Sequence, residues 1–351
     1  MLRWPMAKPR PMDDSRRRLL CAGLAAGALA ALPRSAWALA QGAALPLITK
    51  PIPSTGERLP VIGLGTIWYR DAQYDQLRPV LQRLGELGGT LIDTAAGYGE
   101  SEGVVGRALA ELGTRDRMFV ATKFDRGGPA ASAPAAAPGT TPAPSTTPLP
   151  GPPPGVTRPA RDGVGGRESV ERSLQRLRTD RIDLLQIHNM HGTDELMPLL
   201  LEWKRAGRIR YIGVTTFNPQ QHGMVAEALR KYPIDFVQVD YSIGNRAAER
   251  EVFTAAIERK VAVMANVPLG RATLLQRLAE RPLPPWAADI DVATWSQFLL
   301  KYVVSHPAVT CAIPGTTRVA HLEENMGACR GRLPDAAMRA RMEALWADVI
   351  R

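Results

Sequence analysis

The chain has 351 residues, of which 45% are hydrophobic, and its formal net charge is +10. This length and composition suit one large soluble α/β domain with a full hydrophobic core. The three cysteines do not form a disulfide framework, and the body of the chain has no Lys/Arg block interleaved with aromatic residues. Neither a disulfide-stapled fold nor nucleic-acid binding is therefore expected.

The first forty residues carry the three parts of a signal peptide. Arginines at 16–18 precede an apolar run, 19–32, and Ala38-Leu39-Ala40 has the small-residue pattern of a cleavage site. Paired arginines before a mildly hydrophobic run resemble a twin-arginine signal, with an ordinary secretory leader or a basic tail as alternatives. The run is too short for a stable membrane anchor. We therefore expect residues 1–40 to be cleaved, the twin-arginine export machinery to be a partner, and the mature protein to be periplasmic.

Strand-like and helix-like segments alternate through the rest of the chain. Residues 47–59, with Pro-Ser-Thr-Gly at their middle, predict a short N-terminal hairpin. Eight strand–helix units follow, which predicts an α/β fold of the closed (β/α)8 TIM barrel type. The predicted strands are 61–66, 90–94, 118–124, 182–187, 211–215, 236–241, 261–267 and 310–313, and the predicted helices are 72–87, 101–112, 168–178, 194–206, 219–231, 247–259, 293–305 and 319–327.

A last helix, 334–350, is expected to pack on the outside of the barrel. Met338, Met342, Leu345 and Val349 occur in it at helical spacing, which predicts the stripe that it buries.

Residues 127–166 interrupt this rhythm between the third strand and the third helix. They are mainly Pro, Ala, Gly, Ser and Thr, with almost no large apolar side chain, so they cannot bury enough surface to offset the entropy of ordering them. We predict a disordered insertion within a single barrel domain, 41–351, rather than a domain boundary.

Four polar side chains come at the ends of neighbouring predicted strands, where such a barrel holds its chemistry. Asp93 and Lys123 end two of the strands, Tyr98 follows in a glycine-flanked turn, and His188 comes directly after a third strand. A buried lysine is costly unless it is paired, and Asp93 is its natural partner. Considered alone, these two residues could be an ion pair that only aligns two strands.

Tyr98 favours a catalytic interpretation. A free phenol has a pKa of about 10, too high for an efficient acid at neutral pH. A nearby ammonium such as that of Lys123 can lower this pKa by about 1–3 units. The cluster would then be a tuned proton donor, with His188 as a second donor or an orienting group.

Other interpretations of these residues are weaker. Lys123 could form a Schiff base, but a charged and partnered lysine is a poor nucleophile. His188 and His191 have no further ligands at metal-binding spacing, so no metal site is expected. The Gly-x-Gly pairs at 63–65 and 97–99 lack the third glycine of a dinucleotide fingerprint, which excludes a Rossmann site.

An anion site is predicted after the last strand. Residues 313–318 read Ile-Pro-Gly-Thr-Thr-Arg and precede a helix that carries Glu324-Asn325. Glycine, hydroxyl groups and a helix N-terminus form a phosphate cradle, and TIM barrels often bind phosphate after strands seven and eight. Arg318 adds a positive charge there, although alone it could be a solvated residue at a helix cap.

Together these motifs resemble those of the aldo-keto reductases over almost all of the chain outside 1–40 and 127–166. They are Gly63-Leu-Gly-Thr66, Asp93 with Tyr98-Gly-x-Ser-Glu102, Ala121-Thr-Lys123, Asp183-Leu-Leu-Gln-Ile-His188, Ile212-Gly-Val-Thr-Thr-Phe217, Gln238, and Ile313-Pro-Gly with Glu324-Asn325. The resemblance implies a metal-free barrel that reduces a small aldehyde or ketone to the alcohol by hydride transfer from a nicotinamide cofactor.

The resemblance also implies residue roles. Tyr98 is the general acid, Asp93 and Lys123 tune it, and His188 orients the carbonyl. The implied cofactor-binding residues are Thr66 and Asp93, Thr215, Thr216 and Gln238 at the nicotinamide carboxamide, Leu269, Gly270 and Arg271 near the pyrophosphate, and Gly315, Thr316, Thr317, Arg318, Glu324 and Asn325 along the adenosine half.

This chain departs from many relatives at several positions. Many have Ser-Asn in place of the Thr215-Thr216 pair, and an aromatic residue in place of Asn266. Some carry Lys and Arg where this chain has Gly315 and His321, so the expected preference for NADP rests mainly on Arg318, with NAD as the alternative. A non-catalytic nicotinamide-nucleotide-binding or redox-sensing barrel is the alternative function, and the intact set of four polar residues favours catalysis.

Overall fold

The structure, a computed structural model, describes residues 45–124 and 166–351. The predicted signal peptide, 1–40, and all but the last residue of the predicted insertion, 127–166, lie outside the described residues, so both stay predictions. Helix α5 (Gly166–Leu177) begins at that last residue.

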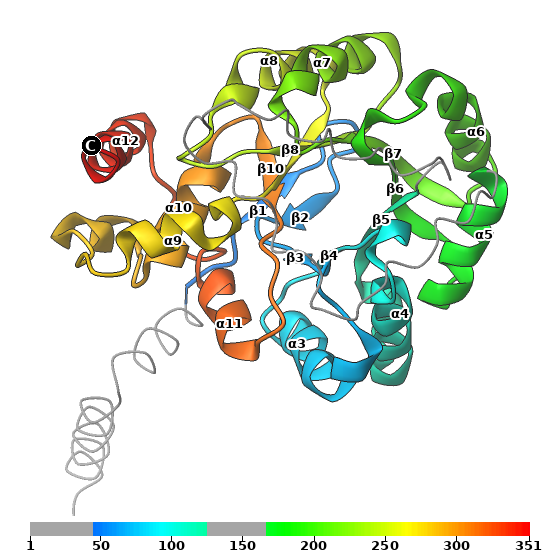
Figure 1. Cartoon of the computed structure of the whole chain (residues 1–351), viewed down its shortest axis with the longest axis horizontal. Helices are drawn as coiled ribbons and strands as arrows, with labels where there is room; N and C mark the ends of the chain where they lie inside the picture. Colours follow the sequence, from blue (N-terminus) through cyan, green and yellow to red (C-terminus); the bar gives the residue numbers. More distant parts are fainter. Residues whose placement is uncertain (1–44, 125–165) are drawn as a thin grey trace, which may run out of the picture. The chain divides into compact units, whose positions relative to one another are not determined.

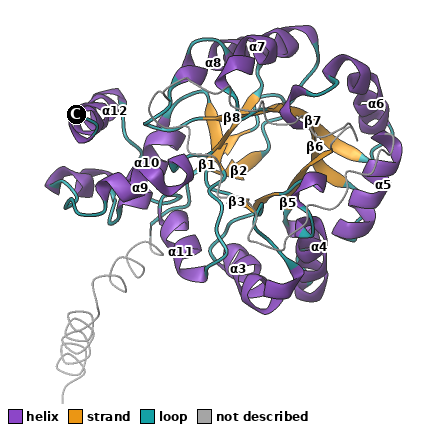
Figure 2. Cartoon of the chain, viewed as in Figure 1, coloured by secondary structure: helices purple, strands orange, loops and turns teal. Residues whose placement is uncertain are grey.

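Eight parallel strands, β3 to β10, surround the centre of the fold, each hydrogen-bonded to the next in chain order (Figures 1 and 2). They are β3 (Leu64–Gly65), β4 (Leu91–Asp93), β5 (Phe119–Phe124), β6 (Ile182–Ile187), β7 (Ile209–Thr215), β8 (Phe236–Asp240), β9 (Ala262–Asn266) and β10 (Val309–Ala312). Backbone hydrogen bonds close β3 onto β10: Gly63 N donates to Ala312 O at 2.8 Å and Gly65 N to Pro314 O at 3.1 Å. The predicted (β/α)8 barrel is confirmed.

The closure leaves little room for a side chain at position 65. A Cβ there would lie 3.1 Å from the backbone oxygen of Ile313, on the neighbouring chain segment. The first strand is shorter than the predicted 61–66, because part of its contact with β10 is made by single bridges, such as Ile62 with Ala312.

Helices cover the outside of the barrel (Figure 2). The α-helices are α3 (Tyr74–Glu86), α4 (Ser101–Leu112), α5, α6 (Thr193–Arg205), α7 (His222–Lys231), α8 (Val252–Arg259), α9 (Thr273–Leu278), α10 (Trp295–Ser305), α11 (Val319–Gly327) and α12 (Ala336–Val349). Short 3-10 helices are η1 (Asp71–Gln73), η2 (Ala96–Tyr98), η3 (Arg115–Arg117), η4 (His188–Met190), η5 (Pro219–Gln221), η6 (Ala247–Glu249), η7 (Gly270–Ala272) and η8 (Pro285–Ile290). The segment that holds α9 and η8 was not predicted, since α9 has only six residues and η8 begins at a proline.

Two separate hydrophobic cores follow from the alternation of side chains along each strand. On β5, Phe119 and Ala121 belong to the core inside the barrel, while Val120 belongs to the core between the sheet and the helices. The same alternation continues upward, so Lys123 lies on the inner face above Ala121. Hydrophobic side chains therefore fill the lower barrel, and polar ones end the inward rows at the carboxyl ends of the strands.

The predicted N-terminal hairpin is confirmed. Strands β1 (Thr49–Pro51) and β2 (Arg58–Pro60) pair antiparallel, with Lys50 opposite Leu59. Ile52 and Leu59 are buried in the core inside the barrel, so the hairpin closes the end opposite to the polar residues.

The predicted last helix is present as α12, but its buried stripe was only partly predicted. Met342 and Trp346 are its buried residues, whereas Met338, Leu345 and Val349 are half-buried. Trp346, which the spacing did not indicate, is buried in place of three of the four predicted residues.

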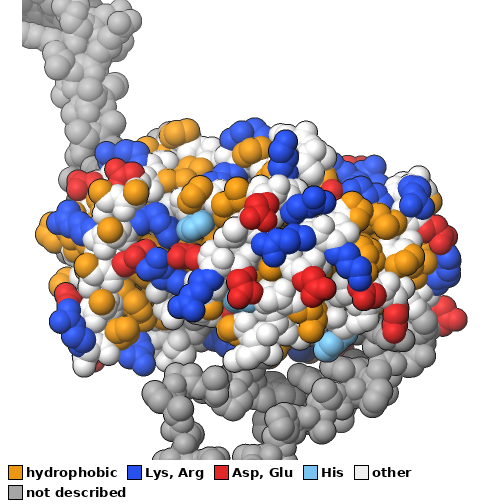
Figure 3. Space-filling model, turned by 90° about the horizontal axis from the view of Figure 1, so that it is seen from above, with side chains coloured by type: hydrophobic (Ala, Val, Ile, Leu, Met, Phe, Trp, Pro, Cys, Tyr) orange, Lys and Arg blue, Asp and Glu red, His pale blue; other side chains and the backbone are white. Residues whose placement is uncertain are grey.

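Charged side chains of both signs are interspersed on the face of the barrel shown in Figure 3. Many charged side chains of the described residues form ion pairs, for example Arg208 with Glu171 and Arg246 with Glu249. No helix among residues 45–124 and 166–351 is long and apolar enough to span a membrane.

Lys301 on α10 is fully buried, and its ammonium donates to the carbonyl oxygens of Ile290 at 2.5 Å and Arg332 at 2.9 Å. Burial lowers the pKa of Lys301 to about 8. In the unfolded chain this lysine keeps its proton up to a pH of about 10.4. Between pH 8 and this value the unfolded chain therefore binds more protons than the folded chain. The free energy of unfolding should therefore rise with pH in this window relative to a chain that lacks the group.

We expect Lys301→Met to remove part of this pH dependence. Between pH 8 and pH 10 the wild-type free energy of unfolding should rise relative to that of the variant by up to about 1.4 kcal/mol per pH unit. Urea denaturation at pH 8, 9 and 10 measures both slopes. Parallel slopes would contradict the prediction.

Candidate active site

A buried ion pair joins β4 and β5 at the upper end of the barrel interior. The ammonium of Lys123 lies 2.8 Å and 2.7 Å from the two carboxylate oxygens of Asp93, and it also donates to the carbonyl oxygen of Thr94 at 2.8 Å. Both charged side chains are at most 3% exposed. All three ammonium hydrogens thus have acceptors, which is the condition under which a buried lysine is tolerated.

The two charges act on each other's protonation. Burial raises the pKa of Asp93, and this effect is opposed mainly by the charge of Lys123. Burial disfavours the ammonium of Lys123, but the charge of Asp93 and the hydroxyl of Tyr98 outweigh it, so the pKa of Lys123 lies above its ordinary value. Lys123 is therefore a lasting positive charge at the site, not an amine nucleophile.

Tyr98 ends η2, directly after β4, and is half-buried. The Lys123 ammonium lies 4.9 Å from the centre of its ring. The next residue, Gly99, has a φ of +69°, a conformation that favours glycine and turns the chain into α4. The turn is tied to the loop after β3, because the Arg70 guanidinium donates to the carbonyl oxygen of Tyr98 at 3.2 Å.

His188 begins η4, directly after β6, and is half-buried. Its ring centre lies 5.9 Å from that of Tyr98, and the two rings meet edge to face. The four residues predicted to be catalytic are thus brought together at one end of the barrel. A carbonyl oxygen near Tyr98 and His188 would have two polar groups to bind it, with an ammonium behind the phenol.

A second row of polar side chains supports Asp93 from across the barrel. Gln186 on β6 is fully buried and donates to Oε1 of Gln238 on β8 at 2.9 Å. A hydrogen bond from Gln238 in turn lowers the pKa of Asp93. Sequence analysis missed Gln186, although its position two residues before His188 places it on the same inward row.

Gly213 on β7 makes room for Gln186. A Cβ at this position would lie 2.8 Å from Cγ of Gln186 and 3.1 Å from the backbone oxygen of Phe236. β7 can therefore approach β6 and β8 closely beside Gln186 because position 213 is a glycine.

Thr215 and Thr216 lie at the carboxyl end of β7, and both are buried. The Thr216 hydroxyl donates to Oε1 of Gln221 at 2.5 Å and accepts from the backbone N–H of Asn218 at 3.0 Å. Its carbonyl oxygen accepts from Nδ2 of Asn266, on β9, at 3.1 Å. The residues predicted to hold the nicotinamide therefore lie together, and most of their polar atoms already have partners.

Thr66 directly follows β3 and is fully buried. Its hydroxyl donates to the carbonyl oxygen of Asp93 at 2.9 Å and shares a hydrogen bond with Ser101 Oγ at 2.8 Å. These contacts hold the exit of β4 in place, and a direct contact of Thr66 with the cofactor stays a prediction.

The loop after β9 carries the residues predicted to approach the pyrophosphate. Val267, Gly270, Arg271 and Ala272 all have φ between +51° and +69°. For a β-branched residue such as Val267 this conformation is strained, and such strain gathers at ligand-binding loops. The Arg271 guanidinium lies 5.6 Å from the ring centre of Phe217, which follows β7, so the two loops touch at their exposed ends.

The predicted anion site lies at the N-terminus of α11. Gly315 and Arg318 are exposed, Thr317 is half-buried, and the N-cap residue Arg318 makes no side-chain hydrogen bond to the helix. The Thr316 hydroxyl accepts from the Arg318 N–H at 3.1 Å, which shapes the turn. Open N–H groups, a glycine and an exposed arginine fit an anionic group such as a phosphate.

Glu324 and Asn325 lie further along α11. Glu324 is half-buried, and Asn325 is buried with its Oδ1 bound by the Ser296 hydroxyl at 2.6 Å. Their contact with the adenosine half of a cofactor stays a prediction.

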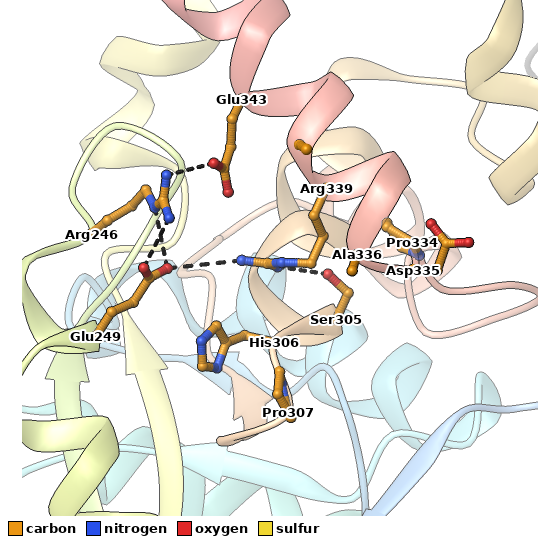
Figure 4. Close-up of a pocket in the computed structure, with 11 residues that line it drawn as sticks. Arg246, Glu249, Ser305, His306, Pro307, Pro334, Asp335, Ala336, Arg339 and Glu343 are labelled. Atoms are coloured by element: carbon orange, nitrogen blue, oxygen red, sulfur yellow. Dashed lines mark hydrogen bonds and ion pairs between the residues drawn. The ribbon is translucent and has the colours of Figure 1, made fainter.

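A groove of about 530 Å³ lies elsewhere, outside the barrel, among η6, the end of α10 and α12 (Figure 4). Its charged side chains bind one another: Arg246 lies 2.9 Å from Glu249 and 2.6 Å from Glu343, and Arg339 donates to the Ser305 hydroxyl at 2.7 Å. None of the predicted site residues lines it. The contacts of Arg246 with Glu343 and of Arg339 with Ser305 fasten α12 to the barrel.

Several known proteins are similar to this chain in sequence or in fold. "Aldo-keto reductase yakc [NADP(+)]" of Schizosaccharomyces pombe is 26% identical over 327 residues, which cover 82% of this chain and 89% of that protein. "Methylglyoxal reductase YeaE" of Escherichia coli is 28% identical over 80% of this chain and 89% of its own length. An aldo/keto reductase from Klebsiella pneumoniae, solved with NADP and acetate, superimposes with a TM-score of 0.63 at 26% identity and covers 83% of this chain and 93% of its own.

The model of the aldo/keto reductase family matches residues 61–346, which include the whole barrel and all four clustered polar residues. The chain therefore belongs to the aldo/keto reductase family of oxidoreductases.

Proposed function

We propose that this protein reduces a small aldehyde or ketone to the alcohol with NADPH, and that Tyr98 is the general acid. The observation that carries the proposal is the cluster of Tyr98, His188 and the buried Lys123–Asp93 pair at one end of the barrel. The names of relatives support the cofactor, since the yeast protein is named for NADP(+) and the Klebsiella protein was solved with NADP.

When bound, NADPH supplies the hydride for the carbonyl carbon. The carbonyl oxygen gains the Tyr98 proton, and the resulting phenolate is stabilised by the Lys123 ammonium, whose charge Asp93 maintains. His188 orients the carbonyl oxygen toward Tyr98. Solvent then returns a proton to the phenolate, so the phenol is restored for the next turnover.

The described residues fit such a cofactor. The uncapped N-terminus of α11 with Gly315 and Arg318 suits a phosphate, and the side chains at the ends of β7, β8 and β9 suit an amide. Thr215, Thr216, Gln238, Leu269, Gly270, Arg271, Gly315, Thr316, Thr317, Arg318, Glu324 and Asn325 would hold it.

We expect Tyr98→Phe to lower the rate of carbonyl reduction by about 10²-fold or more, because it removes the proton donor. The affinity for NADPH should change little. Methylglyoxal is a suitable first substrate, since one relative is named for its reduction. Tyr232→Phe is a matched control, because this half-buried tyrosine hydrogen-bonds with its hydroxyl to Asp194 and takes no part in the proposed site. Near-normal turnover of the Tyr98→Phe protein would refute the assignment of the acid.

We expect Arg318→Ala to erase most of a preference for NADPH over NADH. The 2′-phosphate carries about two negative charges, and losing a charge-assisted hydrogen bond should weaken NADPH binding by about 1.5–3 kcal/mol, with NADH little affected. Arg271→Ala is the contrasting variant, since a pyrophosphate contact would weaken both cofactors alike. The dissociation constants of each protein for NADPH and NADH are measured by titration. If Arg318→Ala weakens the binding of both cofactors equally, Arg318 does not bind the 2′-phosphate.

We also propose that residues 1–40 direct export of the folded protein to the periplasm by the twin-arginine route. Replacing both Arg16 and Arg17 by Lys keeps the charge and removes the guanidinium pair that this route needs. We expect uncleaved precursor to accumulate in the cytoplasm, as measured by immunoblot of cell fractions. Unchanged processing after Ala40 would indicate the general secretory route instead.

A further inference from the structure

We propose that Oδ1 of Asn266 accepts a hydrogen bond from the carboxamide N–H of the nicotinamide, and that Asn266 thereby selects for a cofactor carrying this amide. The inference rests on the proposed function and adds a specificity-determining residue to the same site. It follows from three observations: the place of Asn266 on the barrel, the orientation of its amide, and the engagement of its neighbours.

Asn266 is the last residue of β9 and is half-buried. Met264 and Ala262 precede it at two-residue intervals, and both belong to the core inside the barrel. The alternation along the strand therefore puts Asn266 on the inward face, above Met264. This is the height at which Lys123 and Thr215 end their own strands.

The orientation of the Asn266 amide is determined by its neighbour. Nδ2 donates to the carbonyl oxygen of Thr216 at 3.1 Å, and a carbonyl oxygen can only accept. Oδ1 is thus the other amide atom. It is buried and has no hydrogen-bond donor among the described residues. An unpaired buried oxygen is costly, and an arriving N–H donor would remove that cost.

The neighbouring side chains of Thr216 and Gln238 already make hydrogen bonds within the protein. The Thr216 hydroxyl donates to Gln221 and accepts from Asn218. The Gln238 amide accepts from Gln186 at 2.9 Å and bonds to Asp93. Each of these two oxygens already accepts one hydrogen bond, whereas Oδ1 of Asn266 accepts none from the described residues. Oε1 of Gln186 is also unpaired there, but Gln186 is fully buried inside the barrel. A Thr215 hydroxyl can donate to the carboxamide oxygen, which leaves the N–H for Asn266.

The test compares NADPH with its reduced 3-acetylpyridine analogue, in which a methyl group replaces the amide nitrogen while the carbonyl oxygen is kept. Dissociation constants are measured by fluorescence titration without substrate, so the readout is independent of turnover. We expect the wild-type protein to bind NADPH about 10-fold more tightly than the analogue, as for one lost hydrogen bond. Asn266→Leu, of similar size, should bind the two within about twofold of each other.

Three further variants make the result decisive. Asn218→Leu is the matched control, because the Asn218 side chain already accepts from the Gln220 N–H at 3.2 Å, and it should keep the wild-type ratio. Asn266→Ala provides a second removal of the amide if the leucine disturbs folding, which circular dichroism will report. Thr215→Val should weaken both cofactors and keep their ratio.

The outcomes separate the two proposals. If Asn266→Leu and Asn266→Ala keep the wild-type ratio of the two dissociation constants, Asn266 does not bind the carboxamide N–H. The same conclusion follows if only Thr215→Val abolishes the difference. Equal binding of both cofactors by the wild-type protein also overturns the inference, while the proposed function stands. If the wild-type protein binds neither cofactor, the proposed function itself fails.

Discussion

The buried pair of Asp93 and Lys123 is the constraint on which the rest of this site depends. Two opposite charges that are almost fully enclosed are tolerated only when every hydrogen-bonding position is filled. The Thr94 carbonyl completes the shell of the ammonium, and Gln238, held by Gln186, contributes to that of the carboxylate. Removing either charge would leave the other buried and unpaired, at a cost of about 3–5 kcal/mol. The pair therefore ties β4 to β5, and the hydrogen bonds of Gln238 and Gln186 connect it to β8 and β6.

The fold and the four clustered residues could be predicted because they follow from local patterns. Short apolar runs alternate with amphipathic helices, and each of Asp93, Lys123 and His188 comes at the end of such a run. In a parallel barrel all such ends lie on one face, so no knowledge of distant contacts was needed to bring them together. The roles assigned to the cofactor residues came from the family resemblance and are not decided by the placement alone.

The hydrogen-bond partners could not be predicted in this way. That Gln186 binds Gln238, or that Gln221 occupies the Thr216 hydroxyl, depends on which rotamers fit across strands far apart in the sequence. The helices between β9 and α10 were missed because they are short and lie among prolines. The stripe of α12 was partly wrong because spacing does not tell which side chain, Leu345 or Trp346, reaches the barrel.

The left-handed residues after β9 have a consequence for how many substitutions this loop tolerates. Val267, Arg271 and Ala272 are not glycines, yet each has a φ between +51° and +69°. Such a conformation costs on the order of 1–3 kcal/mol for each non-glycine residue, and it persists only where the surrounding structure holds it in place. A substitution that removes one of the loop's contacts, such as that of Arg271 with Phe217, should therefore let the backbone relax and change the shape of the loop.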